Sequence, residues 1–325
     1  MIHISMGSRL HVTLLDLGYA TQRLYGGLGL AIDQPRTVLQ GGESSRLILR
    51  GFRDSDQAAV QAAVRRLEGT LATTVSGDIR LVAAPPAHIG FGSRTSVVLS
   101  ALGLACRLSG IDVDERVLCK VSGRGGTSSI GMSVFVGHGG LLSDPGRIYV
   151  GRRVFLPSSS SVPPEEPVFA RCGSFPATWR VLLFLPRGRR LSGVAEAKFF
   201  AESTPMRSSD VRDAVAASDW FARSVGAVDI HEAALALARI SSTGFKRLEI
   251  ANQPAVVGDA VRFLAEGSRL PVGMSSVGPL VYAIYRTASD DLQVLRRLGA
   301  EAELLCIGEA DVSEGDGCGC LLGSK

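Results

Sequence analysis

The sequence predicts an α+β fold in two lobes, and three observations support this prediction. The chain has 325 residues, which is long for one domain and sufficient for two. Segments with the period of two that is typical of strands alternate with segments whose apolar positions recur at helical spacing. Residues 152–175 are rich in serine and proline and lack an apolar period, so a lobe boundary or an active-site flap is expected there. We assign residues 1–172 to an N-terminal lobe, 173–310 to a C-terminal lobe and 311–325 to a disordered tail.

The N-terminal lobe is predicted to begin with an antiparallel sheet, because glycine pairs interrupt a series of strand-like segments. These segments are residues 2–6, 9–17, 26–35 and 45–52. Asp54 and Gln57 form a capping-box pattern before a helical apolar repeat, which predicts a helix over 55–72. The other elements predicted in this lobe are a strand at 78–84 and helices at 95–108, from Asp112 onward and within 127–137.

The C-terminal lobe is predicted to alternate strands and helices. Strand-like segments occur at 178–186, 270–276 and 302–307. Helical patterns occur at 193–202, 208–225, 229–242, 254–266, 279–288 and 290–298. This alternation is compatible with a ferredoxin-like lobe.

The composition argues against several classes of protein. A formal net charge of +4, spread along the chain, does not form the concentrated basic face of a nucleic-acid-binding protein. The six cysteines lack zinc-site spacing, which indicates reduced thiols. The N-terminal segment lacks the regions of a signal peptide, and no apolar run is long enough to span a bilayer. We therefore expect a cytoplasmic enzyme that binds neither nucleic acid nor membrane.

A glycine-rich loop links the strand at 78–84 to the helix at 95–108. It contains Gly90, Gly92, Ser93, Arg94 and Thr95. Small residues let backbone N–H groups approach a ligand, and a helix N-terminus adds partial positive charge, so phosphate is the expected occupant. An ordinary strand-to-helix turn can have the same composition, so this loop is informative only together with other motifs.

A second loop of the same kind precedes the helix predicted within 127–137. It contains Arg124, Gly125, Gly126, Thr127 and Ser128. An arginine in such a loop can form paired, charge-assisted hydrogen bonds with phosphate oxygens. Two anion-binding loops suit a ligand that carries phosphate at both ends.

Taken together, these motifs resemble those of one enzyme family. The segment P-A-H-I-G-F-G-S-R-T at 86–95 resembles the phosphate loop of the GHMP superfamily. R-G-G-T-S-S-I-G at 124–131, followed by H-G-G at 138–140, resembles the β-ribofuranosylaminobenzene 5′-phosphate synthases of that superfamily. Further matching segments are R-L-H at 9–11 with Asp16, G-G-L-G at 26–29, and parts of 179–200 and 276–279. The resemblance covers about residues 1–290 and implies an N-terminal lobe like ribosomal protein S5 with a ferredoxin-like C-terminal lobe.

The resemblance implies an enzyme that joins phosphoribosyl pyrophosphate (PRPP) to a carboxylated aromatic ring with loss of CO2 and pyrophosphate, giving a C-ribosyl 5′-phosphate. The loop residues named above are assigned to PRPP, Mg2+ is the expected cofactor, and relatives suggest a homodimer. The other candidates are Arg9, His11, Gly27 and Lys198 for acceptor binding, His138, Asp16 and Lys198 for catalysis, and Asp16 and Glu196 for metal binding.

The acceptor has two candidate classes. Only four of the 35 basic residues are lysines, a bias typical of GC-rich antibiotic producers, and it favours a pyrazole dicarboxylate of the formycin and pyrazofurin type. The alternative is 4-aminobenzoate in methanopterin biosynthesis. A GHMP small-molecule kinase is the other enzyme class that fits the motifs. It is less favoured because Phe91, Arg94 and Thr95 depart from the kinase phosphate loop.

Overall fold

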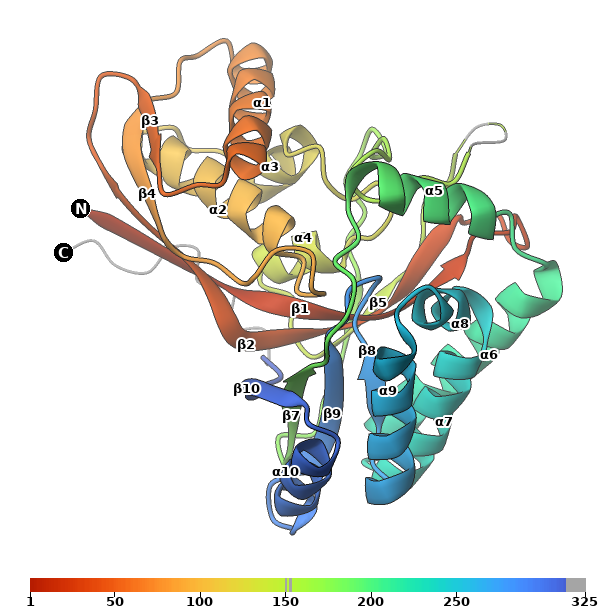
Figure 1. The fold of residues 1–325 in the computed structure, drawn as a ribbon. Helices are drawn as coiled ribbons and strands as arrows, with labels where there is room; N and C mark the ends of the chain where they lie inside the picture. The colour runs from red at the N-terminus through yellow and green to blue at the C-terminus, as the bar shows by residue number, and fades with distance from the viewer. Residues whose placement is uncertain (150, 152–153, 314–325) are drawn as a thin grey trace.

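Two β-sheets form the centres of two lobes in the computed structural model, which describes residues 1–149, 151 and 154–313 (Figure 1). The first sheet has the strand order β3-β4-β2-β5-β6, with β1 paired to β2. Its strands are β1 (Ile2–Asp16), β2 (Tyr25–Gly42), β3 (Leu47–Arg50), β4 (Gly77–Ala83), β5 (Leu141–Asp144) and β6 (Arg171–Gly173). The helices of this lobe are α1 (Asp54–Leu71), α2 (Ser93–Leu108), α3 (Glu115–Val121) and α4 (Ile130–Phe135).

The second sheet is antiparallel, with the order β10-β7-β9-β8. Its strands are β7 (Trp179–Leu185), β8 (Val272–Met274), β9 (Val281–Arg286) and β10 (Leu305–Asp311). The helices are α5 (Gly193–Ser203), α6 (Ser208–Gly226), α7 (Ile230–Ser242), α8 (Gly244–Ala251), α9 (Ala255–Ser268) and α10 (Asp291–Glu301). The α+β class and the two-lobed arrangement predicted from the sequence are confirmed.

The long strands β1 and β2 belong to the cores of both lobes. Successive side chains of a strand point to opposite faces, so one ribbon can serve two cores. Ile4 and Ala31 lie in the core that contains α1 and α2. Leu10 and Leu30 lie in the core that contains the second sheet. Figure 1 shows this ribbon running between the two groups of elements, so both lobes are built on the same pair of strands.

Several predicted elements differ from the structure. Residues 281–286 form strand β9 and not a helix, because this short apolar run lies between β7 and β8 and is buried on both faces. Short runs of this kind have no periodicity that separates a strand from a buried helix. Strand β1 is continuous, whereas two segments were predicted, and α8 was not predicted at all.

The residues at which helices begin were predicted less accurately than the presence of the helices themselves. The helix expected from Asp112 begins at Glu115, because the side chain of Asp114 accepts the backbone N–H of Arg116 and caps it. Helix α1 follows Arg53, and no side-chain hydrogen bond caps it.

Of the residues assigned above to a tail, Asp311 ends β10 in the second sheet, and Val312 and Ser313 pair with the first sheet. Val312 bridges to Ile32, and Gly140 donates its N–H to the carbonyl of Ser313 at 2.6 Å. The C-terminal strand therefore connects the two lobes. Residues 314–325 of the predicted tail lie outside the described residues. No helix in the described part of the chain is long and apolar enough to cross a membrane.

Candidate active site

One cavity of about 120 Å³ lies where the two predicted phosphate loops meet the second lobe. The loop before α2, the loop before α4, the first half of α5 and the turn after β8 all line it. Four arginines and two carboxylates carry its charge: Arg9, Arg53, Arg94 and Arg124 with Asp56 and Glu196. This excess of guanidinium groups favours an anionic ligand.

Glycine is required in the first loop at two positions. Gly90 and Gly92 have φ values of 132° and 74°, which side chains rarely adopt. A Cβ atom on Gly92 would lie 2.8 Å from Nε of Arg9, and one on Gly90 would lie 2.7 Å from the carbonyl oxygen of Ser275. These close approaches place the start of α2 at the cavity, where its free N–H groups can bind phosphate.

Arg94 is positioned by a carboxylate that the sequence analysis missed. Its Nε lies 3.7 Å from Oδ1 of Asp56, in the first turn of α1, while Nε of Arg53 donates to the other oxygen at 2.7 Å. Asp56 is only 1% exposed, so both arginines are held at the cavity by a buried charge. The only sequence signal for Asp56 is that an acidic residue lies on the buried side of the helical apolar repeat of α1.

Arg124 connects the two loops. Its Nε donates to Oγ1 of Thr95 at 3.1 Å, and an NH1 proton is donated to the carbonyl of Ser158 at 3.0 Å. Burial, followed by the charge of Arg94, lowers the pKa of Arg124 to about 10. The side chain therefore remains a cation at neutral pH and presents its charge to the cavity.

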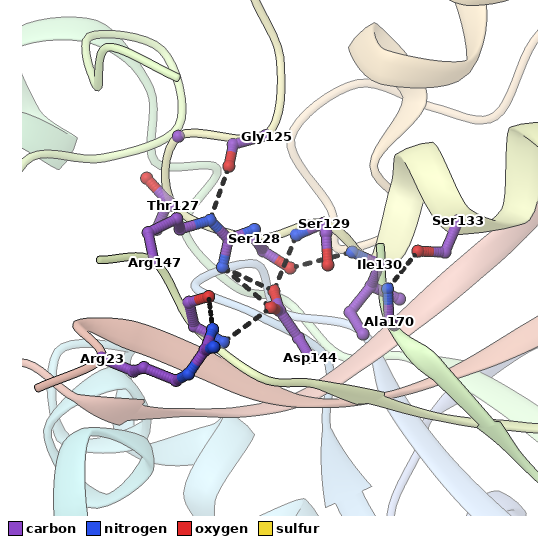
Figure 2. Close-up of polar contacts among 12 residues, drawn as sticks. Arg23, Gly125, Thr127, Ser128, Ser129, Ile130, Ser133, Asp144, Arg147 and Ala170 are labelled. Carbon is purple, nitrogen blue, oxygen red and sulfur yellow. Dashed lines mark hydrogen bonds and ion pairs between the residues drawn. The ribbon is translucent and has the colours of Figure 1, made fainter. Parts of the chain in front are cut away.

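A buried ion pair holds the second loop in place (Figure 2). Both carboxylate oxygens of Asp144 contact NH1 of Arg147, at 2.9 and 2.8 Å, and both side chains are fully buried. Figure 2 shows Asp144 between Arg147 and Ser129, whose N–H it accepts at 2.7 Å. Nε of Arg147 donates to the carbonyl of Gly125 at 2.8 Å. The pair therefore fixes both ends of the loop.

Arg9 and His11 of β1 contact the two loops. A guanidinium proton of Arg9 is donated to the carbonyl of Gly90, and burial lowers the pKa of Arg9 to about 10. His11 lies with its Nε2 3.1 Å from Oγ of Ser128. Burial, followed by the charges of Arg9, Lys246 and Arg147, holds the pKa of His11 well below its usual value. The imidazole is therefore neutral at neutral pH.

A second buried ion pair adjoins these residues, and the sequence analysis missed it because α8 was not predicted. Nζ of Lys246 lies 2.5 Å from Oε2 of Glu249, and the side chains are 1% and 2% exposed. Lys246 also donates to the carbonyls of Met274 and Ser276. An acid three residues after a lysine was the only sequence signal, and such spacing is common on solvated helix faces.

The remaining candidate residues lie away from the cavity. The carboxylate of Asp16 accepts backbone N–H groups from the turn that follows it, including Gly18 at 2.9 Å and Thr21 at 2.6 Å. The ring of His138 hydrogen-bonds the carbonyl of Ala170 at 2.9 Å. Lys198 has a side chain that is 72% exposed and lies 3.7 Å from Glu202. None of these three residues lines the cavity.

Three residues of the motifs have structural contacts. Gly27 allows β1 and β2 to approach closely, since a Cβ atom there would lie 2.2 Å from the carbonyl oxygen of Thr13. A Cβ atom on Gly126 would meet the side chain of Ser161, and Thr127 donates to the carbonyl of Leu156 at 3.1 Å. These contacts fasten the second loop to the segment that contains Ser158.

Of the two predicted metal ligands, Glu196 lines the cavity and Asp16 does not. Among the residues that the structure describes, no group of three or more His, Cys, Asp or Glu side chains is arranged to hold a metal ion. Burial raises the pKa of Glu196, and Arg124 opposes this shift. Glu196 is therefore the one predicted ligand that the structure places at the cavity.

Solved structures with a similar fold include small-molecule kinases and a decarboxylase. Phosphomevalonate kinase from Streptococcus pneumoniae aligns with a TM-score of 0.67 and 12% identity, over 95% of this chain and 98% of that protein. Homoserine kinase from Cytophaga hutchinsonii aligns with a TM-score of 0.65 and 12% identity, over 96% and 95% of the two chains. At this identity the likeness establishes the fold alone, and it confirms the predicted two-lobed GHMP fold.

Relatives that share more of the sequence identify the family, although no family model matches the chain. A β-ribofuranosylphenol 5′-phosphate synthase from Archaeoglobus fulgidus is 33% identical over 87% of this chain and 88% of its own length. The enzyme of the same name from Methanothermobacter thermautotrophicus is 29% identical over 98% of both chains. The chain therefore belongs to the β-ribofuranosylphenol 5′-phosphate synthase family.

Proposed function

We propose that this enzyme transfers the ribosyl 5-phosphate group of PRPP to an aromatic carboxylate, with release of pyrophosphate and CO2. The observation that carries the proposal is the convergence of two glycine-rich loops and four arginines on one cavity. Family membership supports it, because the relatives are named for a product that contains ribose 5-phosphate and a phenol ring.

The family name also favours one class of acceptor. A phenol ring remains when 4-hydroxybenzoate loses its carboxylate, and 4-aminobenzoate would give the corresponding aniline. We therefore favour a benzoate with a hydroxyl or amino group opposite the carboxylate. The pyrazole dicarboxylate that composition favoured has no support from the relatives.

In the proposed reaction, the bond from C1 of the ribose to pyrophosphate breaks first, and the departing electron pair goes to the pyrophosphate. Arg94, Arg124 and the N–H groups at the start of α2 stabilise the charge that develops there. The ring carbon that bears the carboxylate then supplies an electron pair to C1. Loss of CO2 returns the electrons of its bond to the ring and restores aromaticity.

The other residues hold the reactants and exclude water. Arg9, at the back of the cavity, is proposed to orient the carboxylate of the acceptor. Glu196 is the residue that would hold Mg2+, since Asp56 is occupied by Arg53 and Arg94. When bound, Mg2+ would neutralise charge on the pyrophosphate. Holding both reactants in one cavity limits the access of water to a reactive cationic centre.

The test is a reaction with PRPP, Mg2+ and carboxyl-labelled 4-hydroxybenzoate, 4-aminobenzoate or pyrazole dicarboxylate. One labelled CO2 and one pyrophosphate are expected for each product formed, and the ribose bond of the product should survive acid that cleaves N-glycosides. Retention of the label in the product would overturn carbon–carbon bond formation. ATP-dependent phosphorylation of an acceptor without use of PRPP would favour the kinase hypothesis instead.

A further inference from the structure

The cavity extends inward into a small second pocket of about 30 Å³, here called the inner pocket. His11, Leu14, Thr127, Phe200 and Glu249 line the inner pocket alone. Arg9, Ser128, Ser158, Glu196, Ser276 and Val277 line both spaces, so the two adjoin. Thr127 and Ser128 of the second loop form one wall of this space, and the proposed pyrophosphate contacts do not account for its other walls.

We propose that the inner pocket receives the hydroxyl or amino group opposite the carboxylate of the acceptor, and that Glu249 accepts a hydrogen bond from it. Glu249 would then be a specificity-determining residue that selects acceptors with a hydrogen-bond donor at this position. The inference rests on the proposed function, because it requires an aromatic acceptor in the adjoining cavity.

The size of the inner pocket supports this assignment. A water molecule requires roughly 10–15 Å³ of such space. The inner pocket, at about 30 Å³, can hold a hydroxyl or an amino group but not an aromatic ring. The ring must then lie at the junction with the larger cavity, where PRPP is proposed to bind. A carboxylate, with two oxygens and a carbon, fits this space less well than a single heavy atom.

The hydrogen-bonding capacity of the pocket also favours a donor. Lys246 donates to the carbonyls of Met274 and Ser276 and forms an ion pair with Glu249, but Oε2 of Glu249 is buried and has no hydrogen-bond partner. Burial raises the pKa of Glu249, and the charges of Lys246 and Arg9 oppose this shift. In its ionised form the carboxylate has about four acceptor positions, and Lys246 is its only ion-pair partner among the described residues. Glu249 thus retains acceptor capacity at the pocket. The cation that lines the pocket is Arg9, which donates one proton to the carbonyl of Gly90.

His11 and Ser276 provide independent evidence for a ligand. Nδ1 of His11 is buried and has no hydrogen-bond partner, although unsatisfied buried polar atoms are costly. Ser276 has a φ of 57°, an unfavourable conformation that its N–H to the carbonyl of His11 helps to hold. Backbone strain of this kind is concentrated at ligand sites. Both residues line the inner pocket.

The first test uses the unaltered protein and compares benzoates that differ only opposite the carboxylate. A methoxyl group donates electrons to the ring as a hydroxyl does but has no hydrogen-bond donor. We expect kcat/KM for 4-hydroxybenzoate to exceed that for 4-methoxybenzoate by at least about tenfold, the effect of one buried hydrogen bond. Equal values, or faster reaction with a ring that carries a second carboxylate at this position, would overturn the inference.

The second test removes the hydrogen-bonding carboxylate of Glu249 without leaving a buried charge. The double variant Lys246→Met with Glu249→Met replaces the ion pair by side chains of similar volume, which is often tolerated by buried pairs. We expect its ratio of kcat/KM for hydroxyl over methoxyl to fall to about one, a ratio that is insensitive to a shift of the turn held by Lys246 because both substrates meet the same turn. In Glu249→Asp, which keeps the carboxylate, the preference should persist. A double variant that still prefers the hydroxyl would exclude Glu249 as its partner.

These outcomes separate the inference from the proposed function. If the unaltered protein releases CO2 and pyrophosphate fastest with pyrazole dicarboxylate, the role of Glu249 is wrong and the reaction class stands. If no aromatic carboxylate releases CO2 in the presence of PRPP, both are wrong.

Discussion

The cavity arginines differ from surface arginines because each is fixed before a ligand binds. Arg9 is held by the carbonyl of Gly90, Arg94 by Asp56, and Arg124 by Thr95 and Ser158. A guanidinium group that is already positioned loses little conformational freedom when it binds phosphate. Crowding of these cations also has a cost, since burial and mutual repulsion lower the pKa of Arg9 and Arg124 to about 10. A polyanionic ligand relieves this repulsion.

Arg124→Ala tests this arrangement. The substitution removes a charge-assisted hydrogen bond of roughly 1.5–3 kcal/mol, so the affinity for PRPP should fall more than tenfold. Calorimetric titration with PRPP measures the change. Arg107→Ala is the matched control, because Arg107 is exposed in the last turn of α2 and does not line the cavity. Similar affinities in both variants would remove Arg124 from the PRPP site.

His11 predicts a dependence of stability on pH. In the unfolded chain its ring binds a proton below about pH 6.5, whereas the folded protein keeps the ring neutral to a much lower pH. The unfolded state therefore takes up more protons as the pH falls, and the free energy of unfolding decreases below pH 6.5. The decrease is at most about 1.4 kcal/mol per pH unit.

Urea unfolding at pH 7.5, 6.5 and 5.5 measures this effect. The unaltered protein should lose more stability on acidification than His11→Gln, which has no ring to protonate. Parallel profiles for the two proteins would contradict the lowered pKa of His11.

At the scale of elements, the cavity is made by the ends of helices and strands, and buried ion pairs hold these ends in place. Asp144, at the end of β5, and Arg147 fix the loop that leads to α4. Lys246 and Glu249 fix α8 against the turn after β8. Neither Asp144 nor Arg147 lines the cavity, whereas Glu249 also lines the inner pocket. Each pair positions residues that line the cavity.

Asp144→Asn should show how much the second loop depends on its support. The variant leaves the Arg147 guanidinium buried without its partner, which costs about 3–5 kcal/mol. Urea unfolding should show this loss, and the affinity for PRPP should fall because Gly125 and Ser129 lose their anchors. Asp78→Asn breaks an exposed pair with Arg50 and should change little. Equal stability of the two variants would show that the buried pair is dispensable.

Sequence patterns predicted the loops of the site better than the residues behind them. Glycine-rich loops are detectable because their backbone geometry restricts the residue type, as at Gly90 and Gly92. Asp56 and Glu249 were missed because an acid in a helix has the same appearance whether it faces solvent or a buried cation. Strand β9 was misassigned because a short buried run has no period. In all three cases the outcome depends on what is buried in the tertiary structure. The local sequence pattern does not show this.

At the scale of the whole molecule, the phosphate loop is bonded to both lobes. Leu280 donates its N–H to the carbonyl of Ile89 at 3.0 Å, and Oγ of Ser275 donates to the carbonyl of Gly90 at 2.7 Å. The core that contains the second sheet includes Ile89 and Phe91 of this loop. The geometry of the PRPP site therefore depends on how the second lobe packs against the first.

Gly278→Ala tests this dependence between the lobes. A Cβ atom at this position would lie 2.3 Å from the carbonyl carbon and oxygen of Ile89 and 2.8 Å from the backbone nitrogen of Gly90. All three are backbone atoms, so the loop or the turn must shift, at a typical cost of about 1–3 kcal/mol. A displaced loop no longer directs its N–H groups at the phosphate, and PRPP should therefore raise the melting temperature less than in the unaltered protein.

The matched control is Gly226→Ala at the end of α6, where a new Cβ atom has no neighbour within 4 Å. This variant should be as stable as the unaltered protein or slightly more stable, since alanine favours helices over glycine. PRPP should raise its melting temperature by the normal amount. If Gly278→Ala also retains the full PRPP-dependent rise, then the second lobe does not set the geometry of the phosphate loop.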